Sequence, residues 1–345
     1  MDFSSAGKNT LLWVAAKSGG DRWLAGSSWR RDRLVILCYH GVSAWDEHQW
    51  NPDLYISPGK LEERLQFLKS RGYTVLPLAD AVERLQKGSL PRRAVAITFD
   101  DGFADYATTA WPLLKRYQVP ATVYLTTYYS LRQLPIFRLA CYYLLYLARN
   151  RMLEASAILG VDRPVSLASA QQRRELADLW QAKADAEGFS AAQKDEMVQH
   201  LAERLGLEYA ALKKRRILHL MRPEEVTALA RDGADIQLHT HRHRMPQDSA
   251  LVTREIIDNR KALHEMTGYE ATHLCYPNGE YHREQLDLLE RLNVHSATTT
   301  VRGIATSKSH RLLLPRQLDN QHHTLSQFES WLSGIDEFVP KRTRP

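Results

Sequence analysis

Hydrophobic residues gather along the chain in short runs rich in β-branched and aromatic side chains, and helical patterns separate most of these runs. Runs of this kind predict buried strands. The main ones cover residues 34–40, 74–78, 94–100, 121–127, 234–240, 272–277, 296–300 and 311–317. Because strand and helix patterns alternate, the sequence predicts a parallel α/β fold whose strands close into a barrel.

Two helices between these runs have clear start and stop signals. Ser57 and Pro58 supply the cap and the first position of one helix, leucines at helical spacing follow, and Gly72 lies just beyond its end. A second helical pattern follows Ser249 and stops at Gly268.

The alternation is interrupted over residues 128–221, which are rich in Ala, Leu, Gln, Lys, Arg and Glu and show no strand pattern. This composition predicts a helical insertion. Because the insertion follows the strand that ends at Thr127, we expect it to rise from the barrel rim that carries the active site. It serves there either as a lid or acceptor-selecting element, or as a stabilising appendage.

Two adjacent carboxylates, Asp100 and Asp101, end one strand run and precede Gly102. Neighbouring carboxylates repel each other, and a metal ion bound to one of them relieves that cost while the other stays free to accept a proton. The alternative is an ordinary Asp-Gly turn after an edge strand. Taken alone, the motif leaves both interpretations open.

Three histidines, His239, His241 and His243, end the run that begins at residue 234. Neutral imidazole is a common ligand of zinc and similar ions. His239 and His243 share a face if the chain turns helically, whereas His239 and His241 share one if it stays extended. Two histidines and one carboxylate leave metal positions open for water and substrate, so the cluster predicts a catalytic metal site. Zinc is the default ion, with nickel, cobalt or manganese as alternatives.

Several of these motifs resemble those of one enzyme family, the polysaccharide deacetylases, also called the NodB-like group or carbohydrate esterase family four. The segments that carry the resemblance are Thr98-Phe-Asp-Asp-Gly102, His239-Thr-x-x-His243, Cys275-Tyr-Pro-Asn-Gly279 and Leu314-Pro-Arg316. The resemblance implies an irregular (β/α)7-like barrel, here with a helical insertion. It also implies that Asp100 is the catalytic base and that Asp101, His239 and His243 bind the metal.

The third motif departs from the family pattern. Many members carry an arginine there that braces the base, but Cys275 occupies the corresponding position. Arg316, at the end of a later apolar run, could reach the same place. By resemblance, the oxyanion is held by a backbone N–H near Asn278, and we expect Tyr276, Asn278 and Arg316 to contribute the substrate and oxyanion contacts.

A second departure concerns the general acid, which many members supply from a C-terminal Leu-x-His motif. None is present, and His322 and His323 follow a polar stretch instead. His40 ends an apolar run and precedes Gly41, which resembles the exopolysaccharide-type deacetylases, whose first-strand histidine is thought to be the acid. The unperturbed pKa of histidine suits this role. The alternative is a histidine that caps the strand by hydrogen bonding.

The resemblance implies a metal-dependent hydrolase that removes N-acetyl groups from N-acetylhexosamine units of a cell-surface polysaccharide or its lipid-linked precursor. A sugar O-acetyl esterase or deformylase on the same scaffold is one alternative, and it gains support if His40 is not the acid. A catalytically silent carbohydrate-binding protein is another. Asp100 counts against the silent protein, since a structural metal site needs no spare base.

Length and composition are consistent with an enzyme that consists of a single barrel domain, because 345 residues can form one large core. We expect residues 1–33 to form an N-terminal arm, residues 34–127 and 222–336 the barrel, and residues 337–345 a basic tail. The three cysteines, which have no ligand-like spacing, predict buried reduced thiols: Cys38, Cys141 and Cys275. The net charge of +6 is modest, and its scattered basic residues do not favour nucleic-acid recognition.

The sequence also carries signals about membranes and location. The apolar stretch Leu11–Ala16 is too short for a secretory signal, and we expect a cytoplasmic protein. No run approaches the length of about 20 apolar residues that a spanning helix needs. The nearest, Leu139–Ala148, suits a helix at a membrane interface, although packing inside a helical subdomain is the commoner outcome. Basic groups at 30–33, 213–216 and 341–344 are by default solvated faces, and the alternative is attraction to an anionic glycan or to anionic lipid in peripheral contact with the inner membrane face.

Overall fold

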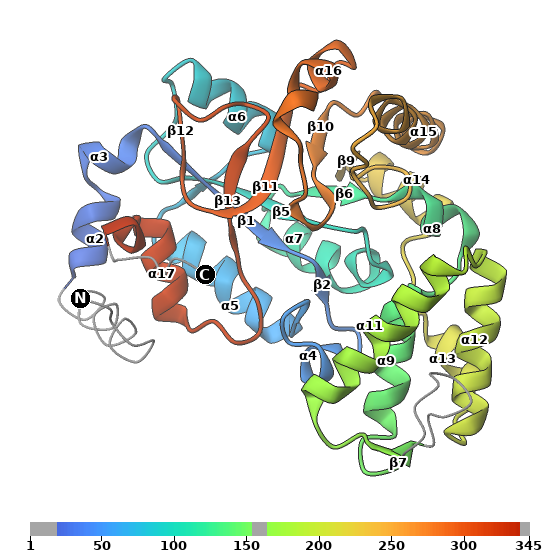
Figure 1. The fold of residues 1–345 in the computed structure, drawn as a ribbon. Coiled ribbons are helices and arrows are strands. Elements are labelled where there is room, and N and C mark those ends of the chain that lie inside the picture. The colour runs from blue at the N-terminus through green and yellow to red at the C-terminus, as the bar shows by residue number, and fades with distance from the viewer. Residues whose placement is uncertain (1–18, 154–163, 339–345) are drawn as a thin grey trace. The chain divides into compact units, whose positions relative to one another are not determined.

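The computed structural model describes residues 19–153 and 164–338 (Figure 1). The apolar stretch Leu11–Ala16 and the basic group at 341–344 lie outside these residues. The chain divides into two compact units: residues 1–128 with 223–345 form the first, and residues 129–222 form the second.

The first unit is built around a closed ring of parallel strands. In the order in which they pair, these are β1 (Arg33–Tyr39), β13 (Leu314–Leu318), β11 (Ser296–Arg302), β10 (His273–Cys275), β9 (Asp235–Leu238), β6 (Thr122–Leu125) and β5 (Ala94–Phe99). Strand β5 pairs again with β1, over Val35↔Val95 to Tyr39↔Phe99, which closes the ring. The predicted seven-stranded barrel is therefore confirmed.

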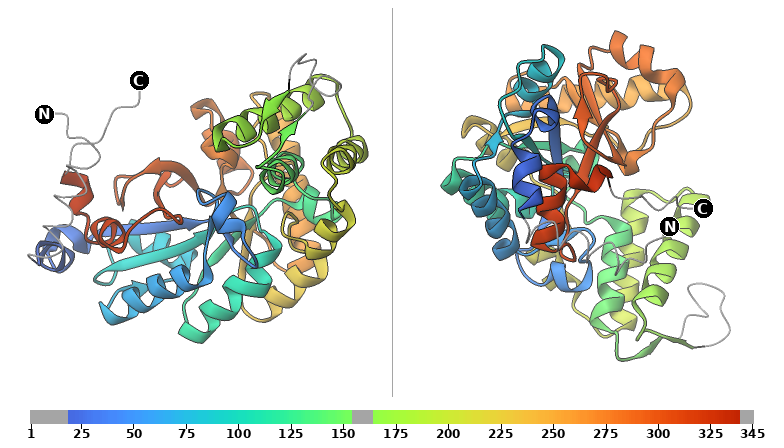
Figure 2. Two further views of the ribbon diagram at one scale, coloured as in Figure 1. Left: turned by 90° about the horizontal axis from the view of Figure 1, so that it is seen from below. Right: turned by 90° about the vertical axis from the view of Figure 1, so that its left-hand side faces the viewer.

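Helices surround the ring, as the views in Figures 1 and 2 show. They include α5 (Pro58–Ser70), α6 (Leu78–Gln86), α7 (Trp111–Tyr117), α14 (Pro223–Arg231), α15 (Ser249–Thr267), α16 (Leu286–Arg291) and α17 (Leu325–Ser333). All six residues of β5 are buried, because core side chains cover both faces of a barrel strand. This burial explains why the run at residues 94–99 is almost continuously apolar.

The predicted helix signals hold with one adjustment. Ser57 caps α5 by accepting a hydrogen bond from the Lys60 backbone N–H, and Gly72, with φ of 66°, follows the helix end. Gly268 ends α15 in the left-handed region. The cap of α15 is Asp248, which accepts from the Leu251 N–H, so Ser249 is the first helical residue.

Short elements complete the first unit: α2 (Gly20–Ala25), α3 (Ser28–Arg31), β2 (Gly41–Val42), α4 (Glu47–Trp50), β3 (Tyr55–Ile56), β4 (Thr74–Val75) and β12 (Ala305–Thr306). The run at residues 74–78 was expected to be a full strand, but only β4 forms, outside the ring against β5, because α6 already begins at Leu78. Arg30 is fully buried and donates to the carbonyls of Leu332 and Ala94, which fixes α3 to the amino end of the barrel.

The second unit is mainly helical. Its helices are α9 (Phe137–Leu147), α11 (Ala170–Ala186), α12 (Ala191–Arg204) and α13 (Tyr209–Arg215), while α8 (Thr127–Arg132) spans the boundary. The expectation that this segment lacks strands was wrong in one detail, since β7 (Met152–Leu153) and β8 (Val165–Ser166) form a short antiparallel pair.

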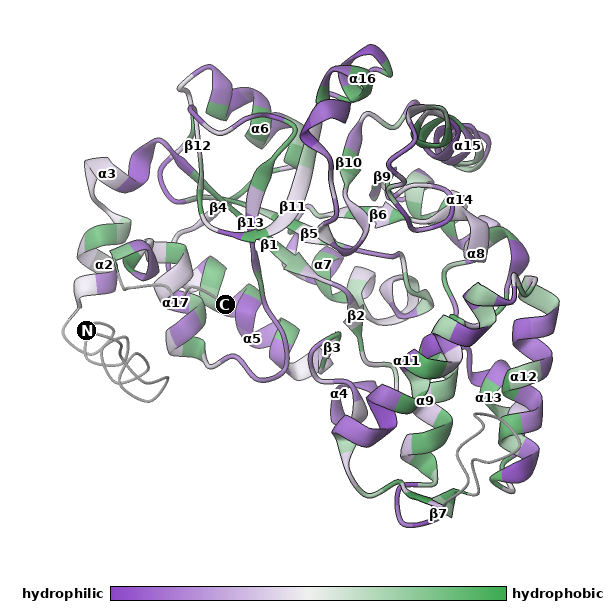
Figure 3. Ribbon diagram, in the orientation of Figure 1, coloured by the Kyte–Doolittle hydropathy of each residue, from purple (hydrophilic) through white to green (hydrophobic). Residues whose placement is uncertain are grey.

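Helix α9 contains most of the apolar run considered for a membrane interface. Eight of its eleven residues are buried, and it packs against α11 and α12 inside the second unit (Figure 3). An interfacial role for this helix is therefore wrong, and core packing is the outcome. Within the residues that the structure describes, no helix is both long and apolar enough to span a membrane.

Candidate active site

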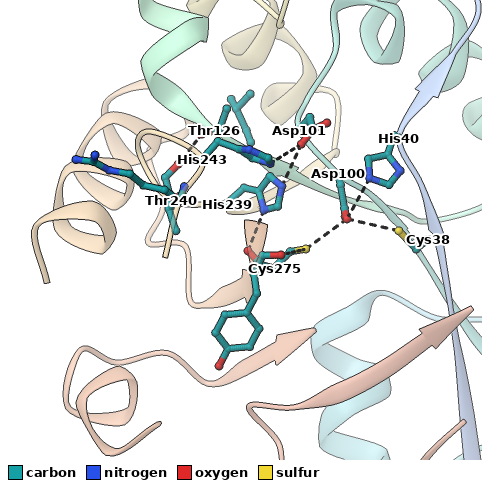
Figure 4. Close-up of polar contacts among 12 residues, drawn as sticks. Cys38, His40, Asp100, Asp101, Thr126, His239, Thr240, His243 and Cys275 are labelled. Atoms are coloured by element: carbon teal, nitrogen blue, oxygen red, sulfur yellow. Dashed lines mark hydrogen bonds and ion pairs between the residues drawn. The ribbon is translucent and has the colours of Figure 1, made fainter. Parts of the chain in front are cut away.

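The predicted site residues gather at the carboxyl end of the barrel strands (Figure 4). His40 follows β1, Asp100 and Asp101 follow β5, and His239 follows β9. Because all neighbouring ring strands are parallel, their carboxyl ends share one rim, where barrel active sites are built. This topology brings together side chains that are up to about two hundred residues apart in the sequence.

Asp101, His239 and His243 form one three-donor cluster. Oδ1 of Asp101 lies 3.1 Å from Nε2 of His239 and 3.1 Å from Nε2 of His243. The chain neither turns helically nor stays extended here: residues 241–243 form bends, with positive φ at Thr240 and His243, and this loop brings His239 and His243 together. His241 is directed elsewhere, with Nδ1 at 2.8 Å from Thr127 Oγ1.

The donor set fits a divalent metal ion. In a tetrahedral site with bonds of zinc length, oxygen and nitrogen donors stand about 3.3 Å apart, close to the observed separations. His239 Nδ1 lies 2.8 Å from the Cys275 carbonyl oxygen and donates to it, so Nε2 is the ring nitrogen that faces Asp101 and would bind an ion. Burial alone would raise the pKa of Asp101, but hydrogen bonds from the two imidazoles bring it well below its usual value.

Asp100 has a different partner, Arg316 of β13. Nη1 and Nη2 of Arg316 each donate to one carboxylate oxygen of Asp100 at 2.7 Å, and the arginine is fully buried. Burial would raise the pKa of Asp100, but the guanidinium lowers it far below the usual value. Arg316 therefore does reach Asp100, the residue predicted to be the base, and it keeps the carboxylate ionised.

Two thiols and one imidazole complete the surroundings of Asp100 Oδ2. The Sγ atoms of Cys38 and Cys275 lie 3.5 Å and 3.4 Å away, and His40 Nε2 lies 3.8 Å away. Cys38, Cys275 and the remaining Cys141 are all free and buried, as predicted. The His40 side chain is 24% exposed, so it faces both Asp100 and the open side of the rim.

The residues of the third motif separate in the structure. Tyr276 is buried, and its hydroxyl donates to the Leu312 carbonyl at 2.9 Å. This side chain therefore packs in the core and does not face the substrate side of the rim. Asn278 is exposed in the loop after β10 and has a φ of 57°. Of the two, only Asn278 lies where a substrate can reach it.

The two C-terminal histidines do not join the cluster. His322 Nε2 lies 3.8 Å from a carboxylate oxygen of Asp53, and His323 Nδ1 lies 3.6 Å from one of Asp319. Of these histidines and His40, the structure places only His40 beside Asp100.

Sequence reasoning missed two buried polar residues of α15 that hold the histidine loop. Asn259 accepts from the His239 backbone N–H at 2.9 Å and donates to the Leu125 carbonyl at 3.1 Å. Glu255 accepts from the Arg242 backbone N–H at 2.7 Å. Their spacing could have identified them. Both residues lie at helical spacing from Val252 and Ile256, on the face of α15 that packs inward.

The family model for polysaccharide deacetylases matches residues 87–140 and 179–297, about half of the chain. The chain belongs to the polysaccharide deacetylase family. Its matched segments are 31% identical over 99 residues to the poly-beta-1,6-N-acetyl-D-glucosamine N-deacetylase of Escherichia coli K12 and 35% identical over 72 residues to that of Staphylococcus aureus MSSA476. These matches cover 28% and 21% of this chain, and 14% and 25% of those two proteins.

Solved deacetylase structures share the fold. The Streptococcus pyogenes deacetylase PplD, in complex with acetate, aligns with a TM-score of 0.58 and 19% identity, over 87% of this chain and 98% of its own. IcaB from Ammonifex degensii aligns with a TM-score of 0.54 and 16% identity, over 88% and 97%. The shared fold thus extends over most of this chain.

Proposed function

We propose that this protein is a metal-dependent hydrolase that removes N-acetyl groups from N-acetylhexosamine units of a polysaccharide or its lipid-linked precursor. One observation carries the proposal. At a single barrel rim, a three-donor metal cluster stands beside a separate carboxylate that is held ionised and an imidazole that is partly open to solvent. The names of the E. coli and S. aureus relatives favour an N-acetylglucosamine polymer as substrate.

Asp101, His239 and His243 would hold the metal. An ion held there would supply Lewis-acid chemistry, which polarises a carbonyl and lowers the pKa of a water molecule. Two imidazoles and one carboxylate favour zinc, while nickel, cobalt and manganese accept the same donors.

Asp100 would accept the proton of the attacking water. Its pair with Arg316 keeps the carboxylate charged, so Asp100 is a proton acceptor and not a donor. A different group must then protonate the departing amine.

His40 would supply that proton. It lies beside Asp100 and reaches the open side of the rim, and imidazole can carry a proton near neutral pH. Amide hydrolysis needs such a donor because an amine anion is a much poorer leaving group than an alkoxide. The backbone N–H near Asn278 would bind the oxyanion, as the family resemblance implies.

Acetate release from N-acetylglucosamine oligomers tests the proposal. The metal-loaded protein should release acetate, whereas a chelated sample and Asp100→Asn should lose most of it, by about 100-fold or more for the variant. Asp287→Asn, which changes an exposed carboxylate on α16, is the matched control and should retain activity. Oligomer cleavage that survives Asp100→Asn would refute the assigned base.

A sugar ester hydrolase is the second candidate, and His40→Ala separates it from the deacetylase. Loss of the acid should lower amide hydrolysis by about 100-fold or more while sparing an activated acetate ester, whose leaving group needs no proton. Ester cleavage alone in the wild type would favour the second candidate. Bound metal without turnover of either substrate would favour a binding protein. The cytoplasmic location and the contact with a membrane face stay predictions that cell fractionation can test.

A further inference from the structure

A second group of metal-ligating side chains lies beside the three-donor cluster: Cys38, His40 and Asp100. Cys38 and His40 are two residues apart along β1 and its end, so in extended chain their side chains lie on one face. The parallel register pairs Cys38 with Thr98 and Tyr39 with Phe99, which sets Asp100 of the neighbouring strand beside them.

The spacing of these atoms matches a metal site. Cys38 Sγ lies 3.5 Å from Asp100 Oδ2, and His40 Nε2 lies 3.8 Å from the same oxygen. In a tetrahedral zinc site, a sulfur and an oxygen donor stand about 3.5 Å apart and a nitrogen and an oxygen donor about 3.3 Å. A small rotation of the partly exposed imidazole would close the remaining gap.

A competing group contains Asp100, His239 and Cys275, but its members are already engaged. His239 belongs to the three-donor cluster, and Cys275 Sγ accepts from Arg316 Nη2 at 3.1 Å. The group with Cys38 shares no residue with the first cluster. It also opens to the rim through His40, which provides an entry path.

We propose that Cys38, His40 and Asp100 form a second metal site that takes a soft divalent cation such as cadmium or excess zinc and inhibits the enzyme. On binding, the Cys38 thiol loses its proton to solvent, and the thiolate, the imidazole nitrogen and the carboxylate oxygen each donate an electron pair to the cation. Asp100 can then accept no proton and His40 can deliver none. The inhibitory part rests on the proposed function, whereas the binding part does not.

This site should be the weaker of the two. The Arg316 guanidinium lies against Asp100 and opposes a further positive charge, as does an ion in the first cluster. Burial also raises the pKa of Cys38 well above its ordinary value, so a cation must displace the thiol proton. Inhibition therefore requires more metal than activation does.

Thiolate-to-cadmium charge-transfer absorption in the ultraviolet tests the binding part, because the first cluster contains no sulfur. The metal-loaded full chain is titrated with cadmium chloride. The band should appear in the wild type and in Cys141→Ser, a matched buried thiol of the second unit, and should be lost in Cys38→Ser. His40→Gln, which keeps the thiol, should require about tenfold more cadmium. A band absent from the wild type, or one that survives Cys38→Ser and disappears in Cys275→Ser, would overturn the site.

Inhibition of acetate release tests the second part, with each variant normalised to its own cadmium-free rate. Cys38→Ser should raise the cadmium concentration for half inhibition about tenfold or more relative to wild type and Cys141→Ser. Equal inhibition of all three would refute the inhibitory role. The binding band in a protein without deacetylase activity would support the metal site and refute the proposed function separately.

Discussion

At the scale of single residues, the two adjacent aspartates differ through their partners. Asp101 faces two imidazoles, whereas Asp100 faces a buried guanidinium. Both carboxylates are ionised, but Asp101 lies between two imidazoles, whereas both oxygens of Asp100 accept hydrogen bonds from Arg316. The neighbours of each side chain, and not its position in the strand, distinguish the two carboxylates.

The Asp100–Arg316 pair should show strong coupling in stability. Arg316→Met leaves a buried carboxylate without its cation and should lower the free energy of unfolding by about 3–5 kcal/mol. Adding Asp100→Asn removes the stranded charge and should recover much of that loss. Chemical denaturation of the two single variants and the double variant measures the coupling. Arg254→Met, at an arginine whose side chain is 68% exposed, is the control and should cost less than about 1 kcal/mol. Additive effects at Asp100 and Arg316 would contradict the pairing.

The sequence alone was enough to predict those candidate residues that belong to short local motifs. Asp100, Asp101, His239 and His243 stand beside strand ends, and His40 follows the first strand run. The contacts of Asp100 with the two thiols could not be predicted, because they arise where three strands from distant parts of the chain meet. For the same reason, Tyr276 was expected to contact the substrate. Its hydroxyl instead bonds to the Leu312 carbonyl in the core, a contact that depends on packing.

At the scale of elements, α15 positions the histidine loop. Asn259 joins the end of β9 to the end of β6, because it bonds to the His239 N–H, the Leu125 carbonyl and the Thr127 hydroxyl. Polar residues on the inward face of an amphipathic helix are a usable sequence signal, but the sequence does not say which strand they meet.

Asn259→Ala should therefore affect both stability and metal binding. It leaves buried polar groups without partners, and we expect a loss of about 2–3 kcal/mol in the free energy of unfolding. Because the His239 backbone is released, metal affinity should fall by about 10- to 100-fold. Denaturation and competition with a chelator measure the two effects. Lys261→Ala, on the exposed face of the same helix, should change neither. Unchanged metal affinity in Asn259→Ala would rule out the positioning role.

In the second unit, the turn after α13 contains a histidine that resists protonation. His219 is 5% exposed, and burial, aided by Arg216 and Lys213, lowers its pKa from 6.5 to about 4. Above pH 6.5 the histidine is neutral in both folded and unfolded chains. Between pH 6.5 and about 4 the unfolded chain binds the proton more readily, so stability is lost as the pH falls.

We expect this histidine to cost about 2 kcal/mol of stability at pH 5 relative to pH 7. Urea denaturation at the two pH values measures the loss, and His219→Gln should reduce it by about that amount. His200→Gln, at a histidine on α12 whose side chain is 76% exposed, should leave the pH dependence unchanged. The same acid sensitivity in His219→Gln and wild type would show that other groups cause it.

At the scale of the whole molecule, the ring strands followed from the sequence better than the element ends did. Runs rich in apolar and β-branched residues marked all seven ring strands, because buried strands leave a strong signal. The length of strand β4 was overestimated, because the apolar run continues through Leu76 to Leu78, where α6 begins. The small β7–β8 pair went undetected because two-residue strands leave no periodicity.

The division into two units predicts that the barrel can fold without the insertion. The ends of the second unit meet, since Ser130 Oγ donates to the Met221 carbonyl at 2.6 Å and the Ile136 N–H donates to the Leu218 carbonyl at 3.0 Å. Replacing residues 131–220 with a short Gly/Ser linker should therefore leave the ring strands and the donor cluster intact. We expect a soluble protein that still binds metal and unfolds cooperatively. Metal analysis and thermal denaturation measure these properties, and a variant that is insoluble or metal-free would show that the barrel needs the insertion to fold.

The same variant tests what the insertion contributes to activity. If the insertion only stabilises, acetate release from short and long N-acetylglucosamine oligomers should fall by the same factor, or not at all. If it selects the acceptor, the long oligomers should lose more, because contacts beyond the reacting sugar are removed. We expect the second result, since long insertions after a barrel strand's carboxyl end commonly carry function. The ratio of kcat/KM for the two oligomers decides between them, and an unchanged ratio would assign residues 129–222 to stability alone.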